Sequence, residues 1–553
     1  MKGFLQIFFY TVLSACLLAL GIPNEFFHFG SPFIGLFSLA PLYLAFNACP
    51  NYKKAGTIGA LHFSLVHILS SFWLANFKGF AIFTLGASAA AYFVAGYIFG
   101  LVLYLPFSNK KNKLTSPYQD KYYFPTRILY FACIWTIHEW YKSVGFLAYP
   151  WGTVLMSAYK WKLLTQIVSI TGTFGLSFLF SLFSAVIGEG IIILKEYPKR
   201  TFSGYNWTVA FCMVIFGLST VYGVFTYTKT RTPIKTFDAV LVQQNSDSWE
   251  EGGQDNSILK AQNLTEAAVM DFYQKTDTKP DIVLWNEAIL TYALPDSYLY
   301  YNAYPRENPL VKSIRKLNIP HLIGGPILVN EEENLFSNSV IFFEKNGDMG
   351  KWYGKIHLVP FAEAIPYADN PLVKKLMDAM VGFSSGWTPG KELTLFQLEN
   401  KQGQNINFST PICFEDAFAD LCRLHFLNGS EVFVNLTNDS WSLTKSAEYQ
   451  HFVIASYRAI ECRTTLVRST NSGFSVVVDP AGNILDSMPL FESVSKTMTI
   501  PVYERIYTPY VITGDIIQYF AIFFALLVIF RFKIFQKKFL KIFLWLISNF
   551  IRC

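Results

Sequence analysis

Three reactive side-chain types stand at the ends of apolar, strand-like runs in the second half of this 553-residue chain. Glu287 closes the run 281–287, Lys355 lies in an aromatic stretch, and Cys413 stands where a strand is expected to give way to a helix. The positive end of a helix dipole favours a thiolate, so we expect a reactive sulfur at Cys413. This combination of residue types indicates covalent catalysis.

The three side chains could together perform acyl transfer. A thiolate from Cys413 would attack an ester or amide carbonyl, while the Glu287 carboxylate takes the thiol proton and later returns one to the leaving group. The Lys355 ammonium, with a backbone N–H, would stabilise the tetrahedral oxyanion. Taken singly, such residues are more often a solvated turn glutamate, a surface lysine and a core cysteine. Their order at strand ends favours catalysis without settling it.

The elements that must position these residues lie in 236–505, where short apolar strands alternate with amphipathic helices. This alternation predicts a layered α/β domain with catalytic residues in the loops after strands. We expect helices at 258–274, 308–316, 415–427 and 446–462. We expect strands at 237–243, 282–285, 321–324, 339–344, 408–413, 432–436, 466–469 and 475–479.

The rest of the chain has the composition of a membrane protein. The sequence is 52% hydrophobic and only 15% charged, and its apolar excess is concentrated in 5–227 and 516–551. Because a span needs about 20 mostly apolar residues, we expect eight spans, at 4–21, 32–48, 56–76, 80–106, 126–146, 163–195, 207–228 and 513–535. The predicted division is therefore a membrane domain at 1–229, a catalytic domain at 230–505, and a terminal helix with a basic tail at 506–553.

Lysine and arginine are biased toward alternate loops. The basic set comprises Lys53, Lys54, Lys110, Lys111, Lys113, Lys121, Lys195, Lys199, Arg200 and the tail after Arg531. The opposite loops hold only Lys78, Lys142, Lys160 and Lys162. The positive-inside rule places the basic set in the cytoplasm, so seven spans leave 230–505 outside. The net charge of +6 thus reports topology, and no basic stripe with aromatics indicates nucleic-acid binding.

Two other cysteine patterns are weaker. The eight cysteines show neither a disulfide framework nor paired metal-ligand spacing. The segment 13–16 has the form of a lipoprotein cleavage box, but 17–20 continue the apolar run where a polar tether would be expected. We therefore interpret this segment as part of the first span, and no cleavable signal is expected.

The chain resembles bacterial apolipoprotein N-acyltransferases, membrane-embedded members of the nitrilase (carbon–nitrogen hydrolase) superfamily. The order of the three residues matches the superfamily, and YGKIHLVPFAE at 353–363 is similar to the lysine motif of these enzymes. Further matching motifs are NDSW at 438–441, QH at 450–451, RSTNSGFS at 468–475, EW at 139–140, YPWG at 149–152 and TGTFGLS at 171–177. The resemblance covers nearly the whole chain, including the membrane half that soluble nitrilases lack.

The resemblance implies a role for each matching residue. Glu287 is the general base, Lys355 the oxyanion stabiliser and Cys413 the nucleophile, on an αββα sandwich. Glu363 corresponds to the second essential glutamate, which supports the lysine and the base. The supporting and substrate-side positions are Phe414 and Glu415 near the acyl pocket, Trp441 on a mobile entrance loop, and Asn338 in a loop that shapes the pocket.

The sequence also departs from the family pattern and leaves some residues open. Asn286 replaces the usual proline before the base, Phe414 replaces a tyrosine, and Ser442-Leu443 replaces Phe-Gly. Arg458, Glu461, Arg463 and Arg468 are as well explained as an ion-pair lattice, and His451 as a structural brace.

The implied function is transfer of a fatty acyl chain from a membrane phospholipid, through a Cys413 thioester, to the α-amine of a diacylglyceryl-cysteine at an apolipoprotein N-terminus. No metal or organic cofactor is implied, and we expect a monomer in the bacterial inner membrane with its catalytic domain in the periplasm. The alternatives are a membrane-tethered amidase that uses water, and a catalytically silent lipoprotein-binding scaffold. The sequence specifies neither the lipid headgroup nor the chain length.

Overall fold

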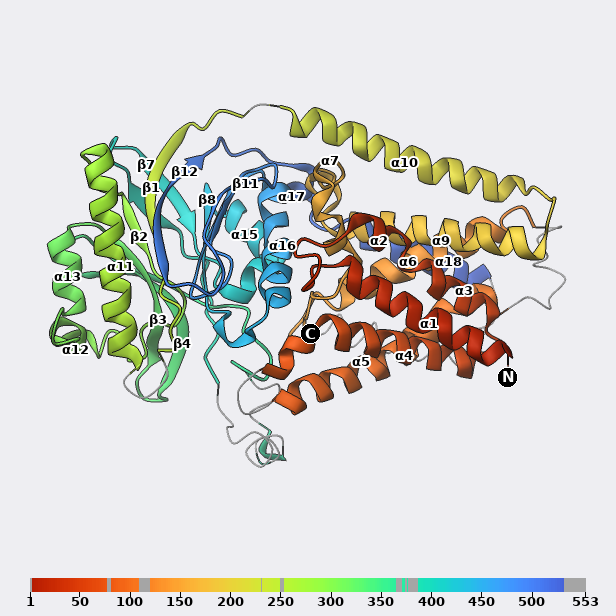
Figure 1. The fold of residues 1–553 in the computed structure, drawn as a ribbon, viewed down its shortest axis with the longest axis horizontal. Coiled ribbons are helices and arrows are strands. Elements are labelled where there is room, and N and C mark those ends of the chain that lie inside the picture. The colour runs from red at the N-terminus through yellow and green to blue at the C-terminus, as the bar shows by residue number, and fades with distance from the viewer. Residues whose placement is uncertain are drawn as a thin grey trace.

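A computed structural model describes residues 2–76, 81–108, 120–229, 231–248, 253–364, 370–372, 375 and 386–531. The N-terminal part is helical and the C-terminal part is an α/β sandwich (Figure 1). The helices of the first part are α1 (Lys2–Gly21), α2 (Pro32–Phe37), α3 (Ala40–Ala48), α4 (Tyr52–Ser70), α5 (Ala81–Leu103), α6 (Tyr123–Tyr141), α7 (Lys162–Thr165), α8 (Val168–Thr171), α9 (Phe174–Glu196) and α10 (Ser203–Tyr227), with short 3-10 turns η1 (Phe72–Asn76), η2 (Leu105–Phe107) and η4 (Val154–Lys160). One helix, α18 (Ile517–Arg531), returns to this bundle after the sandwich.

Each expected span overlaps helix within the described residues, although 32–48 is divided between α2 and α3 and 56–76 between α4 and η1. Among the described residues, four helical segments are long and apolar enough to cross a membrane, Gly3–Gly21, Thr84–Leu103, Phe174–Glu196 and Ser203–Tyr227, and two shorter apolar segments are Pro32–Ala48 and Ile517–Arg531. The expected span 163–195 is divided into α7, α8 and α9. Gly172, at φ +67°, lies between α8 and α9, a left-handed conformation that suits glycine. Lys78, Lys110, Lys111, Lys113 and the tail 536–551 lie outside the described residues.

The sandwich consists of two six-stranded sheets with the same pattern of pairing. The order β12-β1-β2-β3-β4-β5 forms one sheet and β11-β10-β9-β8-β7-β6 the other. In each sheet three central strands are parallel and the outer strands are antiparallel. The strands are β1 (Lys235–Gln243), β2 (Ile282–Leu284), β3 (His321–Asn330), β4 (Leu335–Phe343), β5 (Met349–Gly354), β6 (Phe396–Glu399), β7 (Asn405–Ser409), β8 (Val432–Thr437), β9 (Thr465–Thr470), β10 (Val476–Val478), β11 (Ile484–Ser487) and β12 (Val494–Val502).

Helices cover the outer faces of both sheets, and this confirms the expected layered fold. On one side α11 (Gly253–Thr276), α12 (Tyr298–Ala303) and α13 (Leu310–Leu317) share a core with β1–β4. On the other side α15 (Ala419–Leu427) and α16 (Lys445–Cys462) separate the sandwich from the helical bundle (Figure 1). The alternating burial along β1, in which Val240 and Val242 face α11 while Ala239 and Leu241 face the second sheet, produces this layering.

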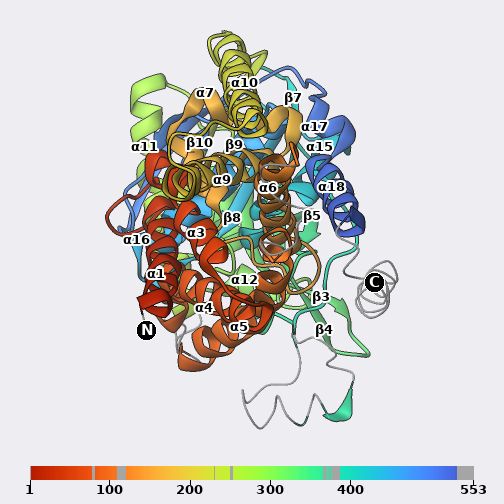
Figure 2. The same cartoon turned by 90° about the vertical axis from the view of Figure 1, so that its right-hand side faces the viewer.

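The sandwich sits on one end of the helical bundle, which Figure 2 shows from the opposite end. Helix α16 makes much of the junction: Gln450 Nε2 donates to the carbonyls of Pro23 and Ser70, and the Tyr457 hydroxyl donates to the Leu155 carbonyl. Because Gln450 is 1% exposed, these hydrogen bonds are shielded from solvent. The ends and connecting segments of the bundle helices therefore contact α16 and fix the position of the sandwich.

Candidate active site

Glu287 follows β2 and is held by a close backbone approach from β3. A Cβ on Gly324 would lie 2.5 Å from Glu287 Cα, so only glycine fits this strand at the point where it passes the carboxylate. The Glu287 side chain is 5% exposed. Its Oε2 accepts a hydrogen bond from the Asn438 backbone N–H at 3.0 Å, which fixes the carboxylate from the opposite sheet.

Lys355 directly follows β5 and lies between two carboxylates. Its Nζ is 3.0 Å from Glu287 Oε1 and 2.9 Å from Glu363 Oε1, and the side chain is 1% exposed. Asn338 Nδ2 donates to the same two oxygens at 2.9 and 2.8 Å. Burial alone would lower the pKa of Lys355, but Glu287 and Glu363 raise it well above its ordinary value. Lys355 is therefore held as a cation by two carboxylates, which Asn338 also bridges.

Cys413 is presented by a strained turn. Strand β7 ends at Ser409, earlier than the expected 413, and Cys413 begins the 3-10 helix η5 (Cys413–Ala417) with φ +49°. A left-handed non-glycine residue costs of order 1–3 kcal/mol and is typical of functional sites. The charges of Glu287 and Lys355 both act on the thiol.

Burial outweighs the effect of the helix start on the pKa of Cys413. Burial raises the pKa of the thiol well above its ordinary value, Glu287 raises it further, and Lys355 only partly offsets this. A single 3-10 turn contributes too small a dipole to overcome the burial. This direction favours a thiol that loses its proton to a base, which agrees with the predicted role of Glu287.

A second polar network lies beside the sulfur, and the sequence analysis missed it. Cys413 Sγ is 3.9 Å from Asp439 Oδ1, within donor distance for a thiol. Asp439 Oδ2 is 2.8 Å from His451 Nδ1, and His451 Nε2 is 2.9 Å from Asp416 Oδ1. Arg468 Nε donates to the other carboxylate oxygen, Asp416 Oδ2, at 3.0 Å. Burial would lower the pKa of His451, but Asp439 and Asp416 raise it to about 9. In the sequence, the only signal for this network is Asp439, which lies inside the NDSW motif at 438–441.

Glu415 connects the lysine loop to the cysteine turn. Its Oε1 accepts from the backbone N–H groups of Ile356 and His357 at 2.7 and 2.9 Å, and its Oε2 accepts from Ile412 N–H at 2.7 Å. The Tyr353 hydroxyl donates to it as well. Burial raises the pKa of Glu415 to about 7. The side chain therefore fixes two catalytic segments relative to each other.

The membrane part contributes aromatic walls to the same region. Trp151 stacks on Phe414 with ring centroids 5.3 Å apart, and Trp73 contacts Trp441 at 5.5 Å. Asn76 donates to the carbonyl of Ser442, next to Trp441 in the short turn η6 (Ser440–Ser442). Phe414 and Trp441 are thus both packed against loops of the bundle.

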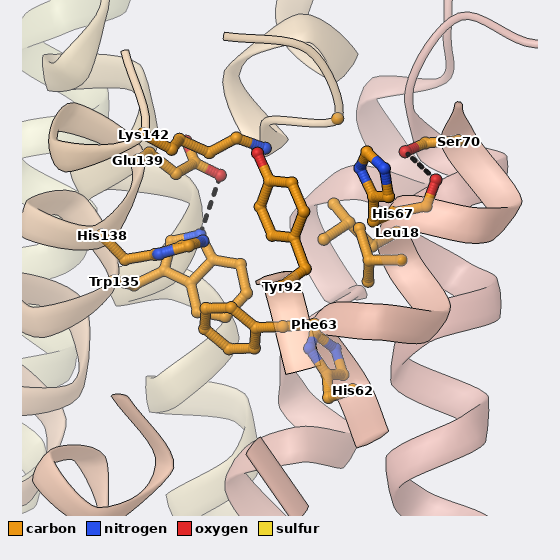
Figure 3. Close-up of a pocket in the computed structure, with 12 residues that line it drawn as sticks. Leu18, His62, Phe63, His67, Ser70, Tyr92, Trp135, His138, Glu139 and Lys142 are labelled. Atoms are coloured by element: carbon orange, nitrogen blue, oxygen red, sulfur yellow. Dashed lines mark hydrogen bonds between the residues drawn. The ribbon is translucent and has the colours of Figure 1, made fainter. Parts of the chain in front are cut away.

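A small cavity inside the bundle is lined by Glu139, which helps to hold the Trp151 loop in place (Figure 3). It has a volume of about 20 Å³, room for roughly one water molecule. At its wall Glu139 Oε1 accepts from Trp135 Nε1 at 3.0 Å and from the Val154 backbone N–H at 2.7 Å. Through Val154, the buried Glu139 anchors the loop that carries Trp151. None of Glu287, Lys355 and Cys413 lines this cavity.

The structure therefore brings Glu287, Lys355, Glu363 and Asn338 into one hydrogen-bonded cluster whose charges act on Cys413. On the side of the bundle, Phe414 packs against Trp151 and Trp441 against Trp73. On the side of the lysine loop, Glu415 accepts from the Ile356 N–H. The roles of these residues stay predictions.

Comparison with known proteins identifies relatives for both halves. Residues 14–186 match the family model for the apolipoprotein N-acyltransferase N-terminal domain, and residues 241–501 match carbon-nitrogen hydrolase. The chain is 41% identical over 508 residues to apolipoprotein N-acyltransferase 2 of Treponema denticola, covering 91% of this chain and 93% of the relative. It is 39% identical to apolipoprotein N-acyltransferase 2 of Treponema pallidum, covering 93% of each. It is 28% identical to the apolipoprotein N-acyltransferase of Borreliella burgdorferi, covering 96% of each.

Proposed function

Because this chain belongs to the apolipoprotein N-acyltransferase family, we propose that it moves a fatty acyl chain from a membrane phospholipid to the α-amine of a diacylglyceryl-cysteine on an apolipoprotein. It is an acyltransferase of the carbon–nitrogen hydrolase superfamily and a membrane protein. The proposal also includes which residues carry the reaction and in which order its steps occur. It includes the division of the chain into a membrane domain at 1–229, a catalytic domain at 230–505 and a terminal helix with a basic tail at 506–553.

The observation that supports this best is the Lys355 cluster beside a buried thiol. In the first half-reaction the Glu287 carboxylate takes the thiol proton, and the thiolate attacks the ester carbonyl of the phospholipid. The tetrahedral intermediate collapses to a thioester on Cys413, and the departing lysophospholipid oxygen recovers the proton from Glu287. Glu287 can serve because the Lys355 ammonium and the Asn438 backbone N–H hold its carboxylate in place.

Lys355 stabilises the negative charge of the tetrahedral intermediate. Its raised pKa means that it does not surrender its proton to either carboxylate, and its charge is always available. Glu363, which also accepts from the Val359 N–H at 2.8 Å, prevents the lysine from pairing with Glu287 alone. One of the two carboxylates can then change its protonation state while the ammonium stays fixed.

In the second half-reaction the α-amine of the acceptor attacks the thioester. Glu287 takes a proton from the amine, an amide bond forms, and the Cys413 thiolate leaves and is reprotonated. The buried site supports transfer over hydrolysis because a water-excluding wall of Trp151 and Phe414 lies beside the sulfur.

The orientation of the protein follows from the loops that contact the sandwich. The loops that supply Pro23, Asn76 and Lys162 to this contact are the ones poor in lysine and arginine. The positive-inside rule then puts the sandwich on the periplasmic side of the inner membrane, next to the outer leaflet. A Lys275→Cys variant, at a side chain of α11 that is 68% exposed, should react with a membrane-impermeant maleimide added outside spheroplasts. Labelling only after lysis would contradict this orientation.

The decisive experiment supplies the two substrates in turn. The purified protein is incubated with phospholipid, freed of excess lipid, and then given a diacylglyceryl-cysteine peptide or buffer alone. We expect an N-acylated peptide and loss of the acyl group from the protein only when the peptide is present. Equal loss in buffer alone would favour an amidase that uses water, and an N-acetylated peptide serves as the matched control acceptor.

A further inference from the structure

One oxygen of the Asp439 carboxylate faces the sulfur of Cys413. Asp439 lies just after β8, at the start of η6, and is 7% exposed. Within the described residues, the only hydrogen-bond donor to its Oδ1 is the Cys413 thiol, at a sulfur–oxygen distance of 3.9 Å. Formation of a thioester on Cys413 removes this S–H. Oδ1 is then a buried acceptor without a donor, in the state of the enzyme that waits for the amine.

The other oxygen of this carboxylate is fixed by cations. Asp439 Oδ2 is 2.8 Å from His451 Nδ1 and 3.9 Å from the Arg468 guanidinium. Burial would raise the pKa of this carboxyl group, but His451, Arg468 and Lys355 hold the pKa below its ordinary value. Asp439 is therefore an ionised carboxylate that accepts hydrogen bonds and does not keep a proton.

The charged groups around the sulfur leave one negative charge in excess. By formal charge, three cations meet four carboxylates there among the described residues: Lys355, His451 and Arg468, and Glu287, Glu363, Asp416 and Asp439. Burial raises the pKa of Glu415 to about 7 and that of Glu448 well above its ordinary value, so neither carboxyl group reverses this excess. Because buried charges require partners, a guest with one positive charge balances the site.

Asp439 is tied to the assigned base through one residue. The backbone N–H of Asn438 donates to Glu287 Oε2 at 3.0 Å, and the charges of Glu287 and Asp439 both act on Cys413. A nucleophile stands about 3–3.5 Å from the carbon it attacks, and a hydrogen-bonded nitrogen about 2.9 Å from its acceptor. An amine at both of these distances is compatible with the 3.9 Å between Cys413 Sγ and Asp439 Oδ1.

We propose that Asp439 Oδ1 binds the α-ammonium of the acceptor beside the Cys413 thioester, and thereby favours a primary, cationic amine over other nucleophiles. The inference rests on the proposed acyl transfer and adds the residue that recognises its acceptor. The thiol occupies Oδ1 in the free enzyme, the ammonium replaces it in the acyl-enzyme, and the thiol returns when the amide leaves.

The three N–H bonds of a primary ammonium account for the protons of this step. Glu287 takes the first proton, which frees the lone pair that attacks the thioester carbon. The C–S bond then breaks with its electron pair moving to sulfur, and Cys413 takes the second proton from the nitrogen. The third N–H stays in the amide product, and it is the one that Asp439 accepts. Glu287 passes its proton to water and is ready for the next turnover.

The relative rates of two nucleophiles test the proposal. The parent chain and Asp439→Asn are loaded with an acyl chain from phospholipid, freed of excess lipid, and mixed at about pH 7 with a diacylglyceryl-cysteine peptide or with hydroxylamine. The peptide amine is mostly charged at this pH, since an α-amino group has a pKa of about 8, whereas hydroxylamine is mostly uncharged. We expect Asp439→Asn to slow transfer to the peptide about 10–100-fold and cleavage by hydroxylamine only about threefold, because a charged donor gains more from a carboxylate than a neutral donor does.

Glu448→Gln is the matched control. It makes the same acid-to-amide change on a buried side chain of α16, but its Oε1 accepts from the Ser442 hydroxyl and not from the sulfur. We expect this variant to keep the parental ratio of the two rates. The parent chain supplies a second measurement that needs no variant. A peptide with an N-methyl α-amine has no N–H left for Asp439 after both protons are consumed, so its transfer should be at least about tenfold slower.

An equal loss with both nucleophiles would give Asp439 a structural role and overturn the proposal. A parental ratio in Asp439→Asn would also overturn it, as would parental transfer to the N-methyl peptide, which decides the matter if Asp439→Asn does not fold. The mass of the acyl adduct is measured before either nucleophile is added. No adduct on the parent chain would contradict the proposed acyl transfer itself, whereas an adduct with an unchanged ratio would contradict only the role of Asp439.

Discussion

His451 gives the site a pH dependence that can be worked out in advance. Its ring is 4% exposed and lies between Asp439 and Asp416 at 2.8 and 2.9 Å. The two carboxylates raise its pKa from about 6.5 in the unfolded chain to about 9 in the folded one. A raised histidine pKa contributes stability that is fully present below pH 6.5 and is lost as the pH rises through 9.

The shift corresponds to about 3 kcal/mol of folding free energy. His451→Gln keeps the ring's size and one donor but cannot carry the charge. We expect the difference in thermal midpoint between the parent chain and this variant to narrow by roughly 6–10 °C between about pH 6.5 and about pH 9.5. The assay is thermal unfolding in one detergent, followed by intrinsic fluorescence at each pH.

His425 supplies the matched control. It is buried in α15, and burial lowers its pKa to about 4, so it titrates below this window. His425→Gln should therefore change the thermal midpoint by the same amount at about pH 6.5 and at about pH 9.5. A constant difference for His451→Gln, or an equal narrowing for His425→Gln, would refute the assignment of a charged His451 beside the nucleophile.

The remaining predictions concern the two half-reactions. Glu287→Gln should slow acyl-adduct formation by about 10²–10⁴-fold, because the base is lost. Lys355→Met should slow it by about 10²–10³-fold, because an oxyanion donor is lost. An acylated Glu287→Gln protein would mean that another group activates the thiol. Trp441→Ala should still form the adduct and slow only transfer to the peptide, since its ring packs against Trp73 of the bundle; loss of the adduct would contradict this role. Glu415→Gln should lower stability by about 2–5 kcal/mol, because its amide would face the Ile412 N–H, and slow adduct formation in proportion; unchanged unfolding would disprove the brace.

The catalytic order could be predicted because each reactive residue follows a strand in sequence. The apolar runs before Glu287 and Cys413 contain the strands β2 and β7, which lie in different sheets, and the packing of the two sheets brings the ends of these strands together. The edge strands β5, β6, β11 and β12 were missed because each carries exposed or half-buried positions and lacks the continuous apolar run of a central strand.

The supporting contacts could not be predicted from the sequence. Glu415 was expected near the acyl pocket because it lies two residues from Cys413, whereas its partners Ile356 and His357 lie about sixty residues away along the chain. The network of Asp439 and His451 likewise joins a loop to a helix. The pKa of the Cys413 thiol is raised mainly by burial, which a local sequence motif does not encode.

The central claim is that Cys413 carries the acyl chain. Its most direct test is the intact mass of the purified protein after incubation with phospholipid and no acceptor. We predict a gain of one acyl chain, located on Cys413 by peptide mapping and removed by hydroxylamine, and no gain in Cys413→Ser. A chain found on Cys422 or Cys462, or an undiminished gain in Cys413→Ser, would contradict the account.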